Sequence, residues 1–199
     1  MMNRVLKAVY LGGLIVEIVI RLPRERQRRQ IQMRDQRVSA AERGLLGLLF
    51  VGTFFLPLVS IVTGWFDRAS YRWSAATKAR AGGVGAALMG AALWLFWRAH
   101  VDLGQNWSPS LEIGERQSLV TRGVYRRIRH PMYASHWLWS IAQALLLQNW
   151  IAGPASLVLF LPLYLVRVPR EEQMMLDHFG DDYRAYIMRT GRVVPRIRR

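Results

Sequence analysis

The sequence contains a run of 36 residues, from Pro131 to Val166, without a single Asp, Glu, Lys or Arg. A helix crosses the hydrocarbon core of a bilayer in about 20 residues, so this run is long enough for almost two crossings. Asn149 and the Gly153-Pro154 pair lie near its middle, where a chain would turn. The run therefore predicts a helical hairpin in a membrane, with both ends on the same side. Those ends bring together four polar side chains that are far apart in the sequence: His130, Arg167, Glu171 and Glu172.

Three further apolar segments have the length of membrane helices: Val5–Ile20, Gly44–Gly64 and Ala81–Trp97. Together with the hairpin they predict an all-α integral membrane protein with about five transmembrane helices. Beyond Pro169, the pattern predicts two short cytoplasmic helices, Arg170–Phe179 and Asp181–Arg189, separated by Gly180. The length of 199 residues is typical of a single domain, which we expect to cover residues 1–199.

The basic residues predict how the chain is oriented. Lys and Arg total 28 against 13 Asp and Glu, although 52% of the sequence is apolar. Of these 28, 22 lie in Arg21–Arg43, in Arg98–Arg129 and after Val166. The positive-inside rule then places the N-terminus outside and the C-terminus in the cytoplasm, in the inner membrane if the protein is bacterial. Because the charge lies between apolar runs, we expect contact with membrane lipids and no nucleic acid.

Arg167 and Glu171 are four residues apart and share a helix face at the cytoplasmic end of the last span. One interpretation is a surface ion pair worth about 0.3–0.5 kcal/mol. The other is an Arg that holds a carboxylate in a fork, beside a Glu that holds a cationic amine. His130 precedes a proline, so it should be extended at a helix start, where unpaired N–H groups collect. Glu17 lies near an end of the first span, where we expect an interfacial carboxylate.

The second half of the chain carries an ordered set of motifs. They are Leu119-Val120-x-x-Gly123-Val124-Tyr125, Arg129-His130-Pro131-x-Tyr133, Trp137, Asn149, Arg167-x-x-x-Glu171-Glu172, Phe179-Gly180-x-x-Tyr183-x-x-Tyr186 and Pro195. In order, spacing and membrane context, this set resembles the isoprenylcysteine carboxyl methyltransferase family and, more distantly, the membrane phospholipid N-methyltransferases. The resemblance covers about half of the chain, from near Leu103 to Pro195. The first two spans carry no matching motif.

The resemblance implies a membrane enzyme that uses S-adenosylmethionine, with S-adenosylhomocysteine as product, and a lipid-borne or prenylated acceptor. Residues 1–80 would then supply N-terminal spans, and residues 81–199 the cofactor-binding and catalytic core. Arg167 corresponds to the family's arginine for the acceptor carboxylate, and Glu171 and Glu172 complete the expected catalytic set. Glu172 would steady Arg167 or a cofactor hydroxyl. The implied cofactor-binding residues are Gln117, Ser118, Leu119, Val120, Tyr125, His130, Pro131, Met132, Tyr133 and Glu171.

The acceptor implied first is the α-carboxylate of a prenylated cysteine or an analogue. A carboxylate is already ionised at neutral pH and needs no general base. Phospholipid amines and thiols are alternative acceptors. A sterol-type reductase that uses NADPH has a similar turn around its His-Pro pair and is an alternative of another class, as is a non-catalytic membrane protein. The four histidines have no paired ligand spacing, so no metal site is predicted.

Overall fold

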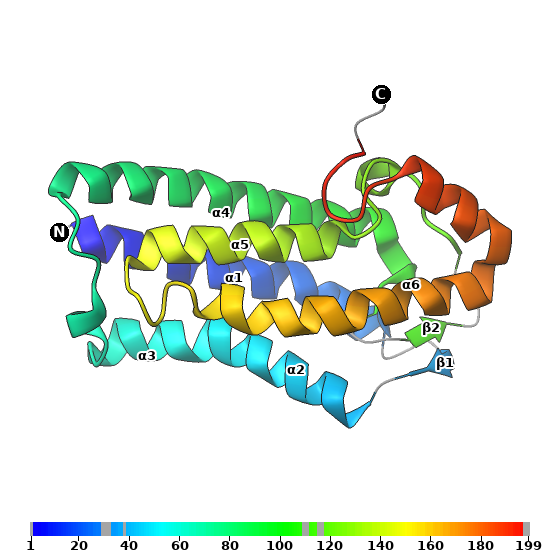
Figure 1. The fold of residues 1–199 in the computed structure, drawn as a ribbon, viewed down its shortest axis with the longest axis horizontal. Coiled ribbons are helices and arrows are strands. Elements are labelled where there is room, and N and C mark those ends of the chain that lie inside the picture. Colours follow the sequence, from blue (N-terminus) through cyan, green and yellow to red (C-terminus); the bar gives the residue numbers. More distant parts are fainter. Residues whose placement is uncertain (1, 29–32, 38, 109–111, 115–117, 197–199) are drawn as a thin grey trace.

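The computed structural model describes residues 2–28, 33–37, 39–108, 112–114 and 118–196. Most of these residues are helical (Figure 1). The helices are α1 (Met2–Arg28), α2 (Ala40–Phe50), α3 (Leu56–Thr63), α4 (Ala75–Leu103), α5 (Pro131–Leu147) and α6 (Ala155–Arg189). A π-helical segment, Val51–Phe55, joins α2 to α3, and short 3-10 turns cover Asp67–Ala69, Gly104–Asn106 and Gly123–Arg126.

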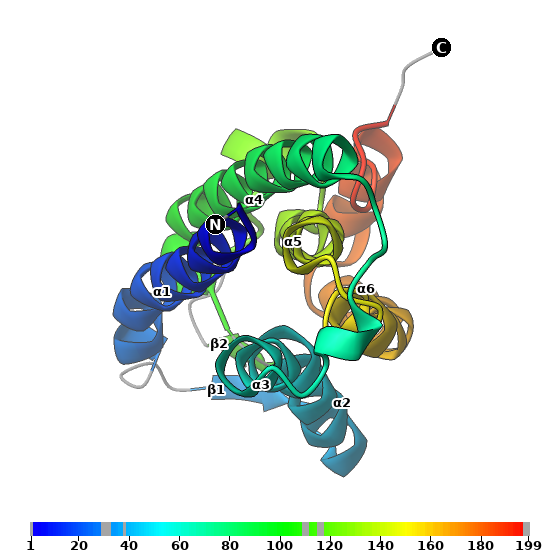
Figure 2. The same cartoon turned by 90° about the vertical axis from the view of Figure 1, so that its left-hand side faces the viewer.

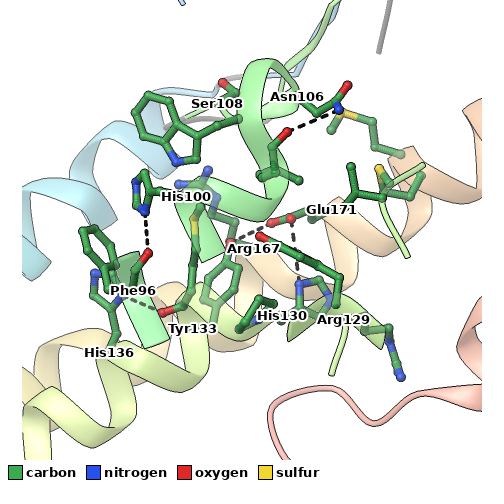
Figure 3. Close-up of a pocket in the computed structure, with 18 of the residues that line it drawn as sticks. Phe96, His100, Asn106, Ser108, Arg129, His130, Tyr133, His136, Arg167 and Glu171 are labelled. Atoms are coloured by element: carbon green, nitrogen blue, oxygen red, sulfur yellow. Dashed lines mark hydrogen bonds and ion pairs between the residues drawn. The ribbon is translucent and has the colours of Figure 1, made fainter. Parts of the chain in front are cut away.

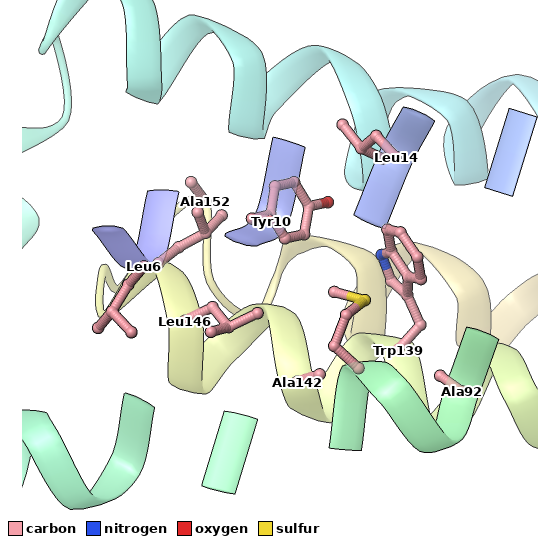
Figure 4. Close-up of a cluster of buried hydrophobic side chains, with 10 residues drawn as sticks. Leu6, Tyr10, Leu14, Ala92, Trp139, Ala142, Leu146 and Ala152 are labelled. Atoms are coloured by element: carbon pink, nitrogen blue, oxygen red, sulfur yellow. The ribbon is translucent and has the colours of Figure 1, made fainter. Parts of the chain in front are cut away.

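Helix α5 lies in the interior of the bundle and packs against α1, α4 and α6 (Figures 1 and 2). It runs antiparallel to α6, and the turn between them contains Asn149 and Gly153. Leu6 and Tyr10 of α1 pack against Trp139 and Leu146 of α5, and Met89 of α4 closes this cluster (Figure 4). The packing holds the first and second halves of the chain together along the length of the bundle.

One buried side chain stabilises the π-helical segment. Gln143, which is fully buried on α5, donates hydrogen bonds to the carbonyls of Gly52 (2.9 Å) and Ala152 (2.7 Å) and accepts one from Tyr10 (2.8 Å). A π-helical turn breaks the regular pattern of backbone hydrogen bonds, and Gln143 supplies a donor to a carbonyl there. The contact fixes the α2–α3 helix against the α5–α6 pair.

Two helices of the described residues are long and apolar enough to cross a membrane: Ala40–Thr63, with mean hydropathy 2.5, and Ala75–Asn106, with mean hydropathy 1.3. Only 22% and 28% of their most apolar windows are buried inside the protein, so they are not the core helices of a water-soluble fold. Aliphatic and aromatic side chains cover the outward faces, among them Phe50, Val62 and Trp94. Such a surface suits lipid and is typical of an integral membrane protein.

The structure corrects three details of the sequence-based description. Helix α1 does not end at Ile20 but continues to Arg28, and Glu17 is buried at 8% exposure rather than interfacial. Helix α6 passes through Pro162 and Pro169 without ending, so no separate helix begins at Arg170. A membrane-type helix tolerates proline where neighbouring groups satisfy the freed carbonyl. Gly180, with φ of +53°, is the break that separates the last turns, up to Arg189.

A small antiparallel ladder was not predicted. Strand β1 (Met33–Gln36) pairs with β2 (Glu112–Gly114), which lies almost 80 residues away in the chain. Neither strand has the alternation of apolar and polar residues that would have indicated it. The pairing ties the segment after α1 to the segment after α4, at the end of the bundle where α6 leaves it (Figure 1).

Gly52 sits where the π-helical segment touches α6, and this contact can be tested. A Cβ atom on Gly52 would lie 2.8 Å from the carbonyl oxygen of Ala155, so Gly52→Ala should destabilise the protein by about 1–3 kcal/mol. Gly44→Ala is the matched control, because a Cβ atom there would meet nothing within 4 Å apart from its chain neighbours and the nearby backbone of its own helix. Thermal unfolding in detergent should show a lower Tm for the first variant only. Equal Tm values would contradict the close approach.

Candidate functional site

A cavity of about 180 Å³ opens at the end of the bundle where α5 begins (Figure 3). Its walls come from α1, α2, α4, α5, α6 and the segment between α4 and α5. One part is apolar and aromatic, with Phe96, Trp107 and Phe160, and another part is charged, with Arg167 and Glu171. A single chamber therefore offers room for both an apolar group and a charged one.

The turn that begins α5 forms one wall of this chamber. His130 is extended, with φ of −125° and ψ of 62°, and Pro131 occupies the first turn of the helix. The N–H groups of Met132 and Tyr133 fall in that first turn, where a helix has no partner for them. The turn is held by the chain far downstream: the amides of Arg129 and His130 donate to the carbonyls of Gly191 and Arg192, both at 2.9 Å.

Glu172 joins that turn to α6. Its carboxylate accepts hydrogen bonds from Arg129 Nε (2.6 Å), His130 Nε2 (3.1 Å) and Arg192 Nη2 (2.6 Å). Burial opposes ionisation of this group, but the three donors outweigh it and hold the pKa of Glu172 well below its usual range. Glu172 thus steadies Arg129 and His130, whereas the sequence analysis had assigned it to Arg167 or a cofactor hydroxyl.

Glu171, which precedes Glu172 on α6, points into the cavity (Figure 3). Its side chain is 31% exposed and accepts a hydrogen bond from the Tyr133 hydroxyl at 2.8 Å. The nearer nitrogen of His130, Nδ1, lies 3.8 Å from the other carboxylate oxygen. A carboxylate has about four lone-pair sites, so Glu171 retains acceptor capacity for a cationic ligand.

Arg167 also reaches the cavity, one helical turn before Glu171. The residue is only 8% exposed. Its Nε atom lies 3.6 Å from a carboxylate oxygen of Glu42, a residue of α2 that is 2% exposed. The sequence analysis does not single out Glu42. The one signal that could have found it is its position two residues before a long uncharged run.

The comparisons with known proteins agree with these motifs. A profile of the isoprenylcysteine carboxyl methyltransferase family matches residues 84–177, which contain the Arg129–Tyr133 turn, Arg167 and Glu171. Residues 84–177 are thus similar to this family.

Two of the curated relatives are named as protein-S-isoprenylcysteine O-methyltransferases. Protein-S-isoprenylcysteine O-methyltransferase B of Arabidopsis thaliana is 36% identical over 99 residues, which cover 49% of this chain and 50% of that protein. Protein-S-isoprenylcysteine O-methyltransferase of Homo sapiens is 32% identical over 87 residues, which cover 44% of this chain and 31% of that protein. The chain spans about half the length of the first curated relatives it matches.

A solved structure is also similar. It is that of the eukaryotic intramembrane Ras methyltransferase, an isoprenylcysteine carboxyl methyltransferase, with a TM-score of 0.49 and 23% sequence identity. The alignment covers 80% of this chain and 54% of that one.

The structure brings most of the residues named from the methyltransferase family resemblance to one cavity. Those that line it are Ser118, Leu119, Val120, Tyr125, His130, Pro131, Met132, Tyr133, Arg167 and Glu171. Gln117 lies outside the described residues. Glu172 is not among the lining residues and instead binds Arg129, His130 and Arg192.

Two residues near the family motifs position the loop before α5, and sequence reasoning did not single them out. Asn106 accepts a hydrogen bond from the backbone amide of Ser118 at 2.9 Å. Asp102 accepts one from the amide of Val124, also at 2.9 Å, and is itself held by Arg98 at 2.8 Å. Both are polar residues beyond the apolar part of α4, a position that gives no sign of a partner further along the chain.

The contact between the α5 turn and residues 190–192 predicts an effect of truncation. A chain that ends at Arg189 loses the backbone bonds to Arg129 and His130. Its affinity for S-adenosylhomocysteine, the product that the family resemblance implies, should fall at least about tenfold, the effect of losing one to two net hydrogen bonds. A chain that ends at Arg196 keeps these bonds and is the control. Calorimetric titration with S-adenosylhomocysteine measures both, and equal affinities would show that the pairing does not support the site.

Proposed function

We propose that this protein is a multi-pass membrane methyltransferase that transfers a methyl group from S-adenosylmethionine to the carboxylate of a prenylated cysteine or an analogue. One observation carries the proposal: Arg167 and Glu171 line the same cavity from neighbouring turns of α6, opposite the His130–Tyr133 turn. This arrangement provides a site for an anion next to a site for a cation. The methyl acceptor supplies the anion and the methyl donor supplies the cation.

The residues around the cavity suit the methyl donor. Glu171 has room to accept the ammonium group, and the first-turn N–H groups of Met132 and Tyr133 suit the carboxylate of the amino-acid part. Ser118, Leu119 and Tyr125 supply a wall for the nucleoside part. When bound, S-adenosylmethionine supplies an electrophilic methyl group on a sulfonium and leaves as S-adenosylhomocysteine. Neither Glu171 nor the helix start needs to change protonation for this role.

Arg167 suits an acceptor that carries a carboxylate. Its guanidinium can hold the carboxylate through N–H groups, which orients one oxygen toward the donor. Because the carboxylate is already ionised at neutral pH, the site needs no base to activate it. Alignment of the two reactants then accounts for most of the acceleration, and such alignment is worth roughly 7–11 kcal/mol.

The membrane arrangement completes the proposal. We infer five spans, formed by α1, the α2–α3 helix, α4, α5 and the first part of α6, with the N-terminus outside and the cavity facing the cytoplasm. The 22 basic residues on one side support this orientation. Residues 1–80 form the N-terminal spans of the single domain, and residues 81–199 form its cofactor-binding and catalytic core. The prenyl chain reaches the apolar end of the cavity from the bilayer, and the soluble donor enters from the cytoplasm.

Binding and transfer assays on the detergent-solubilised chain test the proposal. We expect S-adenosylhomocysteine, and not NADPH, to bind with a saturable heat of titration. With a radiolabelled methyl donor, a prenylcysteine acceptor should be labelled, and ethanolamine lipid and thiol acceptors should not. Binding of NADPH but not of S-adenosylhomocysteine would favour the sterol-type reductase. Binding of neither ligand would favour a non-catalytic protein. Labelling of an amine or thiol in place of the carboxylate would contradict the proposed acceptor.

A further inference from the structure

Glu42 contacts the proposed acceptor site from outside the part of the chain that matches the family. It lies in the first turn of α2, where its amide donates a hydrogen bond to the Ser39 side chain at 3.1 Å. The carboxylate is buried at 2% exposure and stands 3.6 Å from Arg167 Nε. Helix α2 packs along α6, so the two charges are held by two packed helices rather than by flexible segments.

The contact leaves part of the Arg167 guanidinium available. Nε of Arg167 is buried and has no hydrogen-bond partner among the described residues, so Glu42 is close enough for attraction but too far for a bond. A guanidinium carries five N–H groups around its plane and can face more than one carboxylate. Glu42 therefore provides a counter-charge without filling the sites that a ligand would use.

A second carboxylate beside the guanidinium has a chemical consequence. A buried arginine with no counter-charge would attract an acceptor carboxylate strongly, because its charge is uncompensated in a medium of low dielectric. Tight hydrogen bonding also withdraws electron density from the oxygen that must attack the methyl group. A fixed negative charge nearby weakens that hold and leaves the oxygen more nucleophilic. The placement of Glu42 suits a site that must bind a carboxylate and still let it react.

We propose that Glu42 is a positioning residue that shares the Arg167 guanidinium with the acceptor carboxylate and thereby limits how tightly this carboxylate is held. The inference rests on the proposed function and concerns the same cavity. It assigns to the N-terminal spans a part in acceptor recognition: α2 carries the charge that adjusts Arg167. If Glu42 had only a structural role, its replacement would not make acceptor binding tighter while making kcat lower.

The test uses Glu42→Gln, which keeps the size of the side chain and removes its charge. Binding of a prenylcysteine carboxylate to the protein saturated with S-adenosylhomocysteine should become about tenfold tighter, because an opposing charge is gone. The KM for this acceptor should fall, and kcat should fall about tenfold as well. In an Arg167→Ala background, Glu42→Gln should not tighten acceptor binding. Asp181→Asn, an exposed acidic position on α6, is the control and should behave like the wild type.

Other outcomes would separate failure of the role of Glu42 from failure of the proposed function. Unchanged binding, KM and kcat in Glu42→Gln would overturn the role of Glu42 while the proposed function stands. Equal tightening for the methyl ester, which lacks the carboxylate charge, would overturn it too. A wild type that binds S-adenosylhomocysteine but methylates an amine would overturn both the acceptor and this inference. If Glu42→Gln does not fold, Glu42→Asp withdraws the charge by one methylene and should change the same constants in the same directions, by less; no change there overturns the proposal.

Discussion

Replacing Glu171 with alanine is expected to weaken S-adenosylhomocysteine binding at least about 30-fold, because the ligand ammonium loses a charged hydrogen-bond partner inside a cavity. Arg167→Ala should leave that binding within about threefold of the wild type and lower kcat/KM for a carboxylate acceptor at least about 100-fold, as a misaligned nucleophile reacts slowly. The two residues stand on neighbouring turns of one helix, so a general disturbance of α6 would affect both variants alike. Different effects of the two substitutions would therefore reflect the separate roles of Glu171 and Arg167 rather than a shared loss of structure.

Calorimetry with S-adenosylhomocysteine and methyl-transfer kinetics measure the two effects on the same protein samples. Ligand binding by Arg167→Ala also shows that this variant is folded, although Glu42 has lost its nearest described cation. Tyr133→Phe is a milder companion, since it removes one hydrogen bond to Glu171 and leaves the carboxylate in place. Equal loss of ligand affinity in the two alanine variants would refute the division of roles.

The largest effect on stability is expected for Glu172→Ala. The carboxylate is 9% exposed and is shared by Arg129, His130 and Arg192, so its removal leaves buried donors without their acceptor. Removal of one partner of a buried ion pair costs about 3–5 kcal/mol. The Tm in detergent should fall accordingly, and cofactor affinity should fall with it because the α5 turn is released. Asp177→Ala is the control on the same helix: its bond to Arg37 is exposed, and its Tm should change little.

The same carboxylate gives a pH dependence with a definite sign. The folded protein holds the pKa of Glu172 below its usual range, whereas the unfolded chain has the ordinary glutamate value of about 4.3. The stabilisation from Glu172 is therefore complete above about pH 4.3 and is lost as the pH falls through the lower folded value. Between pH 7 and pH 5 the gap in Tm between wild type and Glu172→Gln should stay constant, and it should narrow only below about pH 4. A gap that narrows already between pH 7 and pH 5 would point to another titrating group.

The sequence predicted the convergence of His130, Arg167 and Glu171 because that prediction needs only an uncharged run of known length with turn formers at its middle. Distances along a helix pair follow from residue counts. The resemblance then supplied the residues of the loop before α5, and the structure brings Ser118 and Tyr125 to the same cavity. What the sequence predicted well was therefore local in the chain or fixed by regular geometry.

What escaped prediction depends on packing between distant segments. The Glu42–Arg167 contact joins α2 to α6, and the backbone bonds of His130 to residue 192 join the α5 turn to the C-terminal segment. Pro169 was interpreted as a helix start, because a proline at the first turn is favourable, but the chain around it keeps the helix intact. The burial of Glu17 on α1 depends on which face meets α4 and α5, and a span with few polar residues gives little sign of its orientation.

Because α6 continues without a break past Arg167 and Glu171, the distance between these two residues along the helix axis is fixed. Four residues of α-helix advance about 6 Å, so the anchor points of acceptor and donor stand a constant interval apart, however the surrounding loops move. Under the proposed function, the methyl donor covers that interval, from its ammonium group at Glu171 to the methyl group that faces the acceptor oxygen held by Arg167. The helix thereby sets the distance between the two reactants. Inserting or deleting one residue between Arg167 and Glu171 would turn one of the two side chains away from the cavity.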